Sequence, residues 1–156
     1  MFRPPLFRMK KLKTDGSIKA IYTYVEGRKI VHPLIGAIIP AGFPSPAQDY
    51  IEGTLDLSEH LIRHPSSTFF MYADGYSMIG AGIQPGDLLI VDRALEAQSN
   101  MVIIAIVDNE LTLKRLRIEG GQYWLIPENE EFEPIRITED MDFIVWGVVT
   151  FVIHSL

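Results

Sequence analysis

Residues 101–118 read MVIIAIVDNELTLKRLRI, two apolar runs rich in β-branched side chains on either side of a short polar turn. Valine and isoleucine favour a pleated, half-buried backbone, and an Asp-Asn pair such as Asp108-Asn109 is typical of a tight turn. We therefore predict strands over 101–107 and 111–118. Continuous apolar runs of this length, bounded by turn residues, are typical of strands buried inside a β-protein.

The same pattern extends over most of the chain. Further strands are predicted at 50–57, 68–73, 87–92, 122–126 and 143–153. Turn residues separate them, and a short helix is predicted from a Ser58 cap to Arg63, ended by Pro65. Many short strands with little helix predict a mostly β fold, an antiparallel sandwich or a small distorted barrel.

Length and composition favour one domain plus an N-terminal arm. A chain of 156 residues, 47% hydrophobic and 22% charged, can bury a core without metal or disulfide help. The absence of cysteine excludes disulfides, thiolate metal sites and cysteine nucleophiles. The longest apolar stretch, 143–153, is shorter than the roughly 20 residues of a membrane-spanning helix. With no apolar signal segment behind the basic N-terminus, we expect a cytoplasmic protein without a membrane anchor.

Charge is distributed unevenly along the chain. Residues 1–41 carry eight Lys or Arg against two acidic residues, a net +6, whereas residues 42–156 carry six basic and 18 acidic residues, a net −12. An acidic body is a poor ligand for the phosphate backbone, so we expect no direct sequence-specific DNA binding. The basic arm is open to two interpretations: it contacts DNA or an acidic partner, or it lies against its own acidic domain, which is the simpler reading.

The arm itself is predicted to be loosely organised. Segments 18–25 and 29–33 have strand-like composition around a Glu-Gly-Arg turn and predict a loosely held hairpin or an extended arm. Residues 38–46 contain three prolines and a glycine, which disfavour helix and central strand and favour an extended, accessible backbone. Pro40–Pro44 is therefore a plausible peptidase substrate within the chain.

Ser77 and Lys114 are the candidate catalytic residues. Ser77 follows the predicted strand 68–73 through Asp74-Gly75-Tyr76, a turn that can present a hydroxyl beside free backbone N–H groups. Lys114 lies 37 residues later, between leucines. A serine hydroxyl needs a nearby base, and a lysine serves as one only where burial keeps its amine neutral. Taken singly, an ordinary turn serine and a solvated lysine are the more common occurrences.

Other chemistries have weaker support. A Ser-His-Asp triad is assembled in space and is not excluded by spacing, with His60 and His64 as its candidates. Both are more readily interpreted as loop or surface histidines. No metal-ligand spacing and no nucleotide-binding motif is present, so we expect no metal and no cofactor.

Five ordered blocks carry a resemblance to a known family. They are residues 41–47 (AGFPSPA), 61–66 (LIRHPS), 75–79 (GYSMI), 86–92 (GDLLIVD) and 113–116 (LKRL). In order and in serine-to-lysine spacing the chain resembles the UmuD proteins, within the LexA-like self-cleaving serine peptidases, over about residues 41–156. Two positions depart from that pattern: Tyr76 stands where UmuD proteins usually carry an acidic residue, and Asn100-Met101 replaces a Gly-acidic pair.

The resemblance implies a role for each matching residue. Ser77 is expected to be the nucleophile and Lys114 the general base, with the backbone N–H groups of Tyr76 and Ser77 as oxyanion donors. The scissile bond is expected between Ala41 and Gly42. The implied organisation is an N-terminal arm, 1–41, removed by self-cleavage, and a LexA/UmuD-like distorted β-sandwich or barrel peptidase domain, 42–156.

The resemblance also implies partners. A RecA-type recombinase filament on single-stranded DNA would stimulate cleavage, and the product would join a UmuC-like polymerase of the Y family as its accessory subunit. The family forms homodimers. The alternative left open is a non-catalytic dimeric module that binds a polymerase without being processed.

Overall fold

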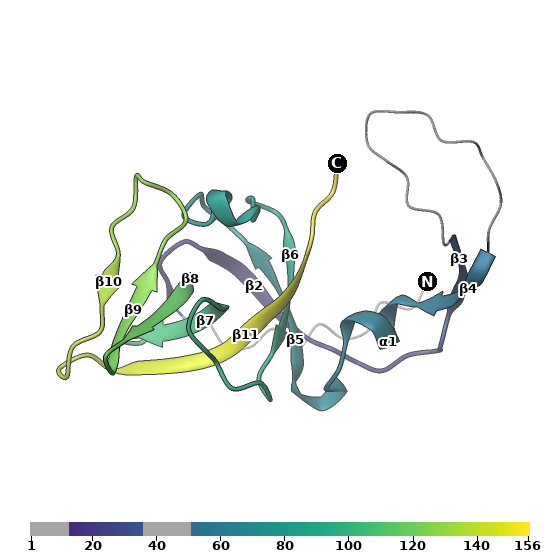
Figure 1. Ribbon diagram of the computed structural model, residues 1–156, viewed down its shortest axis with the longest axis horizontal. Helices are drawn as coiled ribbons and strands as arrows, with labels where there is room; N and C mark the ends of the chain where they lie inside the picture. Colours follow the sequence, from purple (N-terminus) through teal and green to yellow (C-terminus); the bar gives the residue numbers. More distant parts are fainter. Residues whose placement is uncertain (1–12, 36–50) are drawn as a thin grey trace. The chain divides into compact units, whose positions relative to one another are not determined.

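A nine-stranded sheet forms most of the protein. The computed structural model describes residues 13–35 and 51–156, which divide into two units: one joins the described residues up to Val25 with His64–Leu156, and the other is Glu26–Arg63. The strands of the larger unit are β1 (Lys13–Thr14), β2 (Ile18–Thr23), β5 (Thr68–Ala73), β6 (Leu88–Asp92), β7 (Val102–Val107), β8 (Glu110–Glu119), β9 (Gln122–Ile126), β10 (Ile135–Arg136) and β11 (Phe143–Ile153) (Figure 1). Two short 3-10 turns, η1 (Pro65–Ser67) and η2 (Ile79–Ala81), interrupt them.

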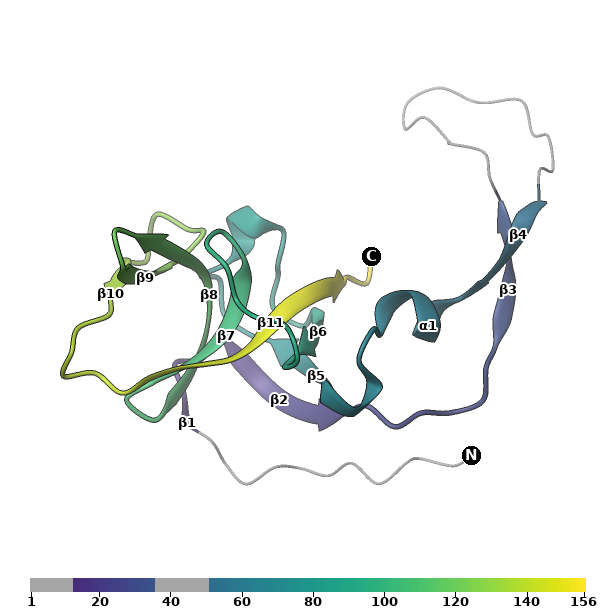
Figure 2. The same ribbon diagram turned by 60° about the horizontal axis from the view of Figure 1, so that its bottom comes forward.

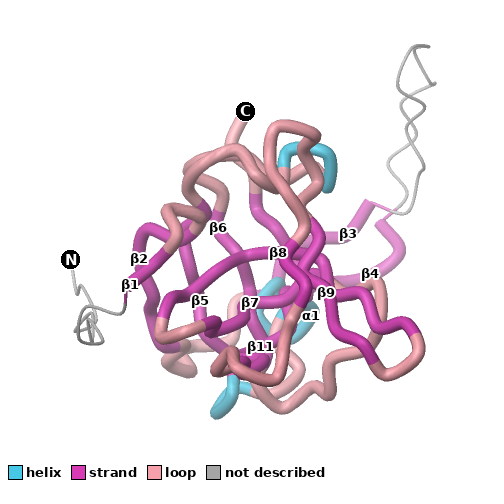
Figure 3. The backbone as a smooth tube through the Cα atoms, turned by 90° about the vertical axis from the view of Figure 1, so that its left-hand side faces the viewer, coloured by secondary structure: helices cyan, strands magenta, loops and turns pink. Residues whose placement is uncertain are grey.

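The N-terminal segment links two strands that lie far apart in the order of the sheet. The strand order is β10-β9-β8-β7-β11-β6-β5-β2, and neighbours along it are antiparallel. β1 pairs in parallel with the start of β8, and β2 pairs with β5 four strands further along this order. Residues 13–23 therefore bridge β8 and β5, and the sheet curls round on itself, as Figures 2 and 3 show.

The core explains why β7 and β8 are apolar on both faces. Ile104, Leu111 and Leu113 belong to one buried cluster with residues of β2, β5 and β6, while Ile103 and Leu116 belong to a second cluster. Side chains alternate between the faces of a strand, so a strand buried on both sides reads as a continuous apolar run. Any polar side chain on β8 within this stretch is consequently withdrawn from water.

The smaller unit is a strand pair followed by a helix. β3 (Val31–Ile35) pairs antiparallel with β4 (Ile51–Asp56), and α1 (Leu57–Leu61) follows directly. The helix is capped by Asp56, whose Oδ1 accepts a hydrogen bond from the Glu59 N–H at 3.0 Å, so the predicted Ser58 cap was wrong by two residues. The Asp56 carboxylate also accepts from the Ile30 N–H, at 3.1 Å, because a carboxylate serves several donors at once.

The sequence predictions of strands are largely confirmed, and the predicted mostly β fold with them. β5, β9 and β11 have the predicted bounds, and the other predicted body strands differ from theirs by one residue at one or both ends, whereas β10 was not predicted. For the arm, a loosely held hairpin or an extended arm was predicted; the hairpin was wrong, because its two strands take different partners: β2 pairs with β5, and β3 with β4. Within the described residues, no helix has the length and apolar character needed to cross a bilayer.

Candidate active site

Ser77 lies in a turn that is tied down from the opposite loop. Gly75 adopts a left-handed backbone with φ of +69°, which glycine accepts without strain. The loop after β9 holds the turn: the Glu128 N–H donates to the Ser77 carbonyl at 2.8 Å, and the Asn129 side-chain amide donates to the Tyr76 carbonyl at 2.9 Å. The Ser77 side chain is buried, with 6% of the residue exposed. Its hydroxyl therefore has a fixed and largely dry position.

Lys114 reaches that hydroxyl from the middle of β8. Its Nζ lies 3.3 Å from Ser77 Oγ, 2.9 Å from Thr112 Oγ1, 3.1 Å from the Leu113 carbonyl oxygen and 3.2 Å from Asp15 Oδ2. Only 4% of the lysine is exposed. The contact with Thr112 confirms the prediction that the two residues share a face of the strand, because they are two positions apart. The structure thus brings together the two candidate catalytic residues.

These contacts are those of a charged lysine. An ammonium group has three N–H donors and no acceptor, and four oxygen atoms surround Nζ within hydrogen-bonding distance. Burial disfavours the charge, whereas the Asp15 carboxylate favours it. For Lys114 to accept the Ser77 proton, the ammonium must first lose one of its own.

Asp15 is the group that sequence reasoning missed. Its carboxylate accepts from the Ser17 hydroxyl and N–H at Oδ1 and from the Thr112 hydroxyl at Oδ2, besides the contact with Lys114. Burial by itself would raise the pKa of Asp15, but these hydrogen bonds and the lysine charge outweigh it and hold that pKa below its usual value. Asp15 is therefore a carboxylate at neutral pH. The sequence shows only that Asp15 and Glu26 are the acidic residues of an otherwise basic arm, residues 1–41, and this does not indicate a contact with β8.

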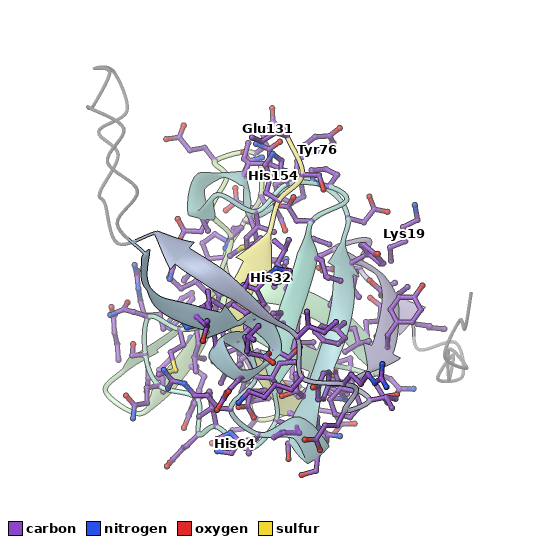
Figure 4. The ribbon with its side chains drawn as sticks, turned by 90° about the vertical axis from the view of Figure 1, so that its right-hand side faces the viewer. Lys19, His32, His64, Tyr76, Glu131 and His154 are labelled. Carbon is purple, nitrogen blue, oxygen red and sulfur yellow. The ribbon has the colours of Figure 1, made fainter. Side chains whose placement is uncertain are left out.

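The backbone at the serine turn offers the expected oxyanion donors. Within the described part of the chain, neither the Tyr76 N–H nor the Ser77 N–H donates a hydrogen bond, so both are available to an acceptor. The Tyr76 side chain is 61% exposed and extends outward from one end of the domain (Figure 4).

The histidines have other partners. His64 Nδ1 lies 2.6 Å from Asp92 Oδ2, and His154 Nδ1 lies 2.6 Å from Asp87 Oδ1. Figure 4 shows His64 at the opposite end of the domain from Tyr76, the neighbour of Ser77. His60 lies in α1 of the other unit. No His-based triad with Ser77 is formed by His64 or His154.

The predicted cleavage site and the Asn100 departure from the family pattern remain to be located in the structure. Ala41 and Gly42, the predicted cleavage site, lie outside the described residues. Asn100, at the position where the resemblance has glycine, adopts φ of +74°, a left-handed conformation that asparagine tolerates better than most residues. Asn100 thus provides a left-handed residue in the turn before β7.

A curled β domain with a buried serine hydroxyl against a lysine amine has the features expected of a LexA/UmuD-type serine peptidase domain. Residues 33–150 match the model of the peptidase S24-like family. Protein MucA of Escherichia coli is 44% identical over 119 residues, covering 76% of this chain and 79% of MucA. Protein ImpA of Escherichia coli is 45% identical over 124 residues, covering 80% and 84%.

A LexA repressor is a more distant relative. The LexA repressor of Aeromonas salmonicida is 37% identical over 126 residues, covering 78% of this chain and 60% of the repressor. The chain therefore belongs to the peptidase S24-like family, as a UmuD-like member. The family resemblance seen in the sequence is confirmed.

Proposed function

We propose that this protein cleaves its own backbone between Ala41 and Gly42, using Ser77 as nucleophile and Lys114 as general base. The observation that carries the proposal is the 3.3 Å approach of Lys114 Nζ to Ser77 Oγ, with both side chains buried. That distance is within the looser range found for catalytic pairs before substrate binds. Membership of the peptidase S24-like family supports the same chemistry.

The steps follow from these groups. Lys114, once neutral, takes the Ser77 hydroxyl proton as Oγ forms a bond to the Ala41 carbonyl carbon. The Tyr76 and Ser77 N–H groups receive the negative charge that develops on the carbonyl oxygen. The Ala41–Gly42 bond then breaks, Lys114 returns the proton to the Gly42 amine, and water releases residue 41 from the serine ester. Charge on the lysine blocks the first step, so cleavage is faster as pH rises.

The biological setting belongs to the same proposal. A RecA-type filament on single-stranded DNA would stimulate cleavage in the cytoplasm, and residues 42–156, as a homodimer, would serve a UmuC-like Y-family polymerase during error-prone synthesis. Cutting after residue 41 separates a +6 segment from a −12 body. If the segment then left the body, the long-range attraction of the body for charged partners would change.

One observation favours a second candidate, the non-catalytic accessory module. The Asp15–Lys114 ion pair, at 3.2 Å, stabilises the lysine form that cannot act as a base. If that pair never opened, the β domain would bind its partners without being processed. The two candidates differ in whether residues 1–41 are ever cut from the chain.

Substitutions at the two proposed catalytic residues test the dyad. We expect Ser77→Ala to abolish self-cleavage at alkaline pH, and Lys114→Arg to slow it by about 10²–10⁴-fold, the usual contribution of a general base. Arginine preserves the positive charge opposite Asp15 but does not deprotonate, so it separates the base role from the ion pair. Denaturing gels followed over time measure the rates.

Exposed residues of the same types provide the controls. Ser66→Ala, between β4 and β5, and Arg117→Ala, on β8 three residues from Lys114, alter side chains at the surface. Both variants are expected to cleave at the unmodified rate. Continued cleavage between residues 41 and 42 in Ser77→Ala, or cleavage at the unmodified rate in Lys114→Arg, would exclude the proposed pair.

A further inference from the structure

We propose that Asp15 is a positioning residue of the Ser77–Lys114 pair: its carboxylate holds Lys114 as a bound ammonium and thereby keeps self-cleavage at a low resting rate. This inference rests on the proposed function. It assigns a role to the N-terminal arm, which belongs to the site through space although it lies 99 residues from Lys114 in the sequence.

Asp15 is itself held rigidly, as a positioning residue must be. Its backbone N–H donates to the Leu111 carbonyl on β8 at 3.0 Å, and the Ser17 hydroxyl accepts from the Leu113 N–H at 2.9 Å. The Thr112 hydroxyl donates to Asp15 and accepts from Lys114, so it links acid and base in one chain of hydrogen bonds. Linked hydrogen bonds of this kind, here partly buried, fix the geometry of their members.

The charged group that contacts Lys114 favours its ammonium form. Among described residues, Asp15 is the ionised group in contact with Nζ. Asp74, on the serine turn, uses its carboxylate to accept from the Gly75 N–H, and Arg115, the next residue on β8, pairs with Glu128. Ser77 and Thr112 contribute neutral hydroxyls. The Asp15 carboxylate is therefore the contact that favours the charged lysine, against the burial that disfavours it.

The arrangement implies a means of activation. Asp15 contacts Lys114 only while residues 13–17 lie along β8, held by the β1 pairing and the two backbone contacts to Leu111 and Leu113. Lifting this segment from β8 would withdraw the carboxylate and leave the lysine buried without its counter-charge. A buried lysine without a partner loses its proton readily, which is the condition that cleavage requires.

Asp15→Asn tests the proposal, because asparagine has nearly the same shape without the charge. We expect the pH–rate profile of self-cleavage to move to lower pH by about one unit or more, the usual effect of one neighbouring opposite charge. At neutral pH this corresponds to cleavage about tenfold faster. Asp15→Glu is expected to restore the original profile in large part, and Glu119→Gln, an exposed change on β8, to leave it unchanged.

A profile of Asp15→Asn that coincides with the unmodified protein, or moves to higher pH, overturns the proposal. Its failure is separable from that of the proposed function by NMR titration of the Lys114 side chain in Ser77→Ala protein, where no cleavage is needed. Asp15→Asn should lower the pH at which Lys114 loses its proton. An unchanged titration would contradict the role of Asp15 even if self-cleavage were established.

The strand pairing of the arm carries a second inference: after cleavage, residues 1–41 stay bound to residues 42–156. β2 pairs with β5 from Ile18 to Thr23, and Ile18 is 4% exposed within the core cluster. Tyr22 and Tyr24 stack edge-on against Tyr72 and Phe70, with ring centroids 5.9 Å apart in each pair. None of these contacts requires an intact Ala41–Gly42 bond.

Native and denaturing measurements on one cleaved sample test retention. Denaturing gels report whether the cut occurs, which tests the proposed function, and native mass spectrometry with size exclusion reports whether the pieces stay together. We expect one complex of both pieces at physiological salt. Elution of residues 42–156 without the arm would overturn the inference.

An introduced cut makes the retention test independent of self-cleavage. A specific protease site placed at residues 41–42 of Ser77→Ala protein produces the same two pieces. Ile18→Asp, which places a charge in the core, is expected to release the arm after this cut. Lys19→Ala, at the exposed neighbouring position (Figure 4), is expected to leave it bound.

Discussion

At the scale of single residues, the site is a hydrogen-bonded network in which Lys114 and Thr112 are buried and the Asp15 side chain is 31% exposed. The acid and the base neutralise each other, and removing the acid would leave the charge of the buried Lys114 without its partner. Asp15, Thr112 and Lys114 are thus coupled, and Ser77 completes the set as a neutral acceptor. Under the proposed role of Asp15, the ion pair that stabilises the fold would also slow self-cleavage.

Acid should reveal the Asp15 contribution to stability. Because the pKa of Asp15 in the folded protein lies below the unfolded value of about 3.8, its stabilising effect is present above that value and is lost as pH falls through the folded pKa. We expect the unmodified protein to be more stable than Asp15→Asn at pH 7, and this difference to shrink below about pH 4. Thermal unfolding at pH 7, 5, 4 and 3 measures it.

The control for this effect is an acidic residue outside the network. Glu119→Gln, at an exposed position of β8, is expected to follow the unmodified protein at every pH. A stability difference between Asp15→Asn and the unmodified protein that stays constant from pH 7 to pH 3 would contradict the assignment of a lowered pKa to Asp15.

Ser77 and Lys114 were predictable from the sequence, and Asp15 was not. The serine and the lysine sit in local patterns, a glycine turn after a strand and an apolar run, that indicate their surroundings. Asp15 acquires its role from a contact across 99 residues, and nothing adjacent to it in the sequence indicates β8. The residues beside Lys114 in the sequence, Leu113 and Arg115, are not acidic, so the carboxylate that contacts it could be found only from the fold.

At the scale of elements, η2 fixes the serine turn against the loop after β9. The Gly80 N–H donates to the Glu128 carbonyl at 2.7 Å, and a Cβ at position 80 would come within 2.5 Å of that same oxygen. A backbone oxygen does not yield as the end of a flexible side chain does. The glycine therefore allows the close approach that holds Ser77.

Gly80→Ala should consequently separate the turn from the loop. We expect the free energy of unfolding to fall by about 1–3 kcal/mol, the usual cost of overpacking, and self-cleavage to slow because Ser77 shifts from Lys114. Gly53→Ala, on β4, is the control, since a Cβ there meets no atom within 4 Å. Denaturant unfolding of both variants checks the prediction, and equal stabilities would contradict the proposed close contact.

Strands were easier to predict than their partners. Apolar alternation and turn residues locate β5, β9 and β11 to the residue, because these signals are local. Local signals do not identify the partner of β2. They suggest a hairpin with the nearest strand-like segment, 29–33, but β2 pairs instead with β5, some 50 residues further along the chain. The two-residue β1 and β10 are too short to produce a periodic signal.

At the scale of the whole molecule, the N-terminal segment is part of the domain that it was expected to leave. Residues 13–23 join β8 to β5 and bury Ser17 and Ile18. Cleavage after residue 41 would then cut a connection while the sheet stays complete. If the arm remains, the assembly keeps the net charge of −6 and does not change to −12, so partner selection through charge would change little.

The most direct measurement of the central claim is the intact mass of the purified protein after incubation at alkaline pH, beside Ser77→Ala treated identically. Self-cleavage predicts two species, residues 1–41 and 42–156, in the unmodified sample and the full chain alone in the variant. A full-length chain in both samples, a cut at another bond, or the same cut in Ser77→Ala would contradict the account.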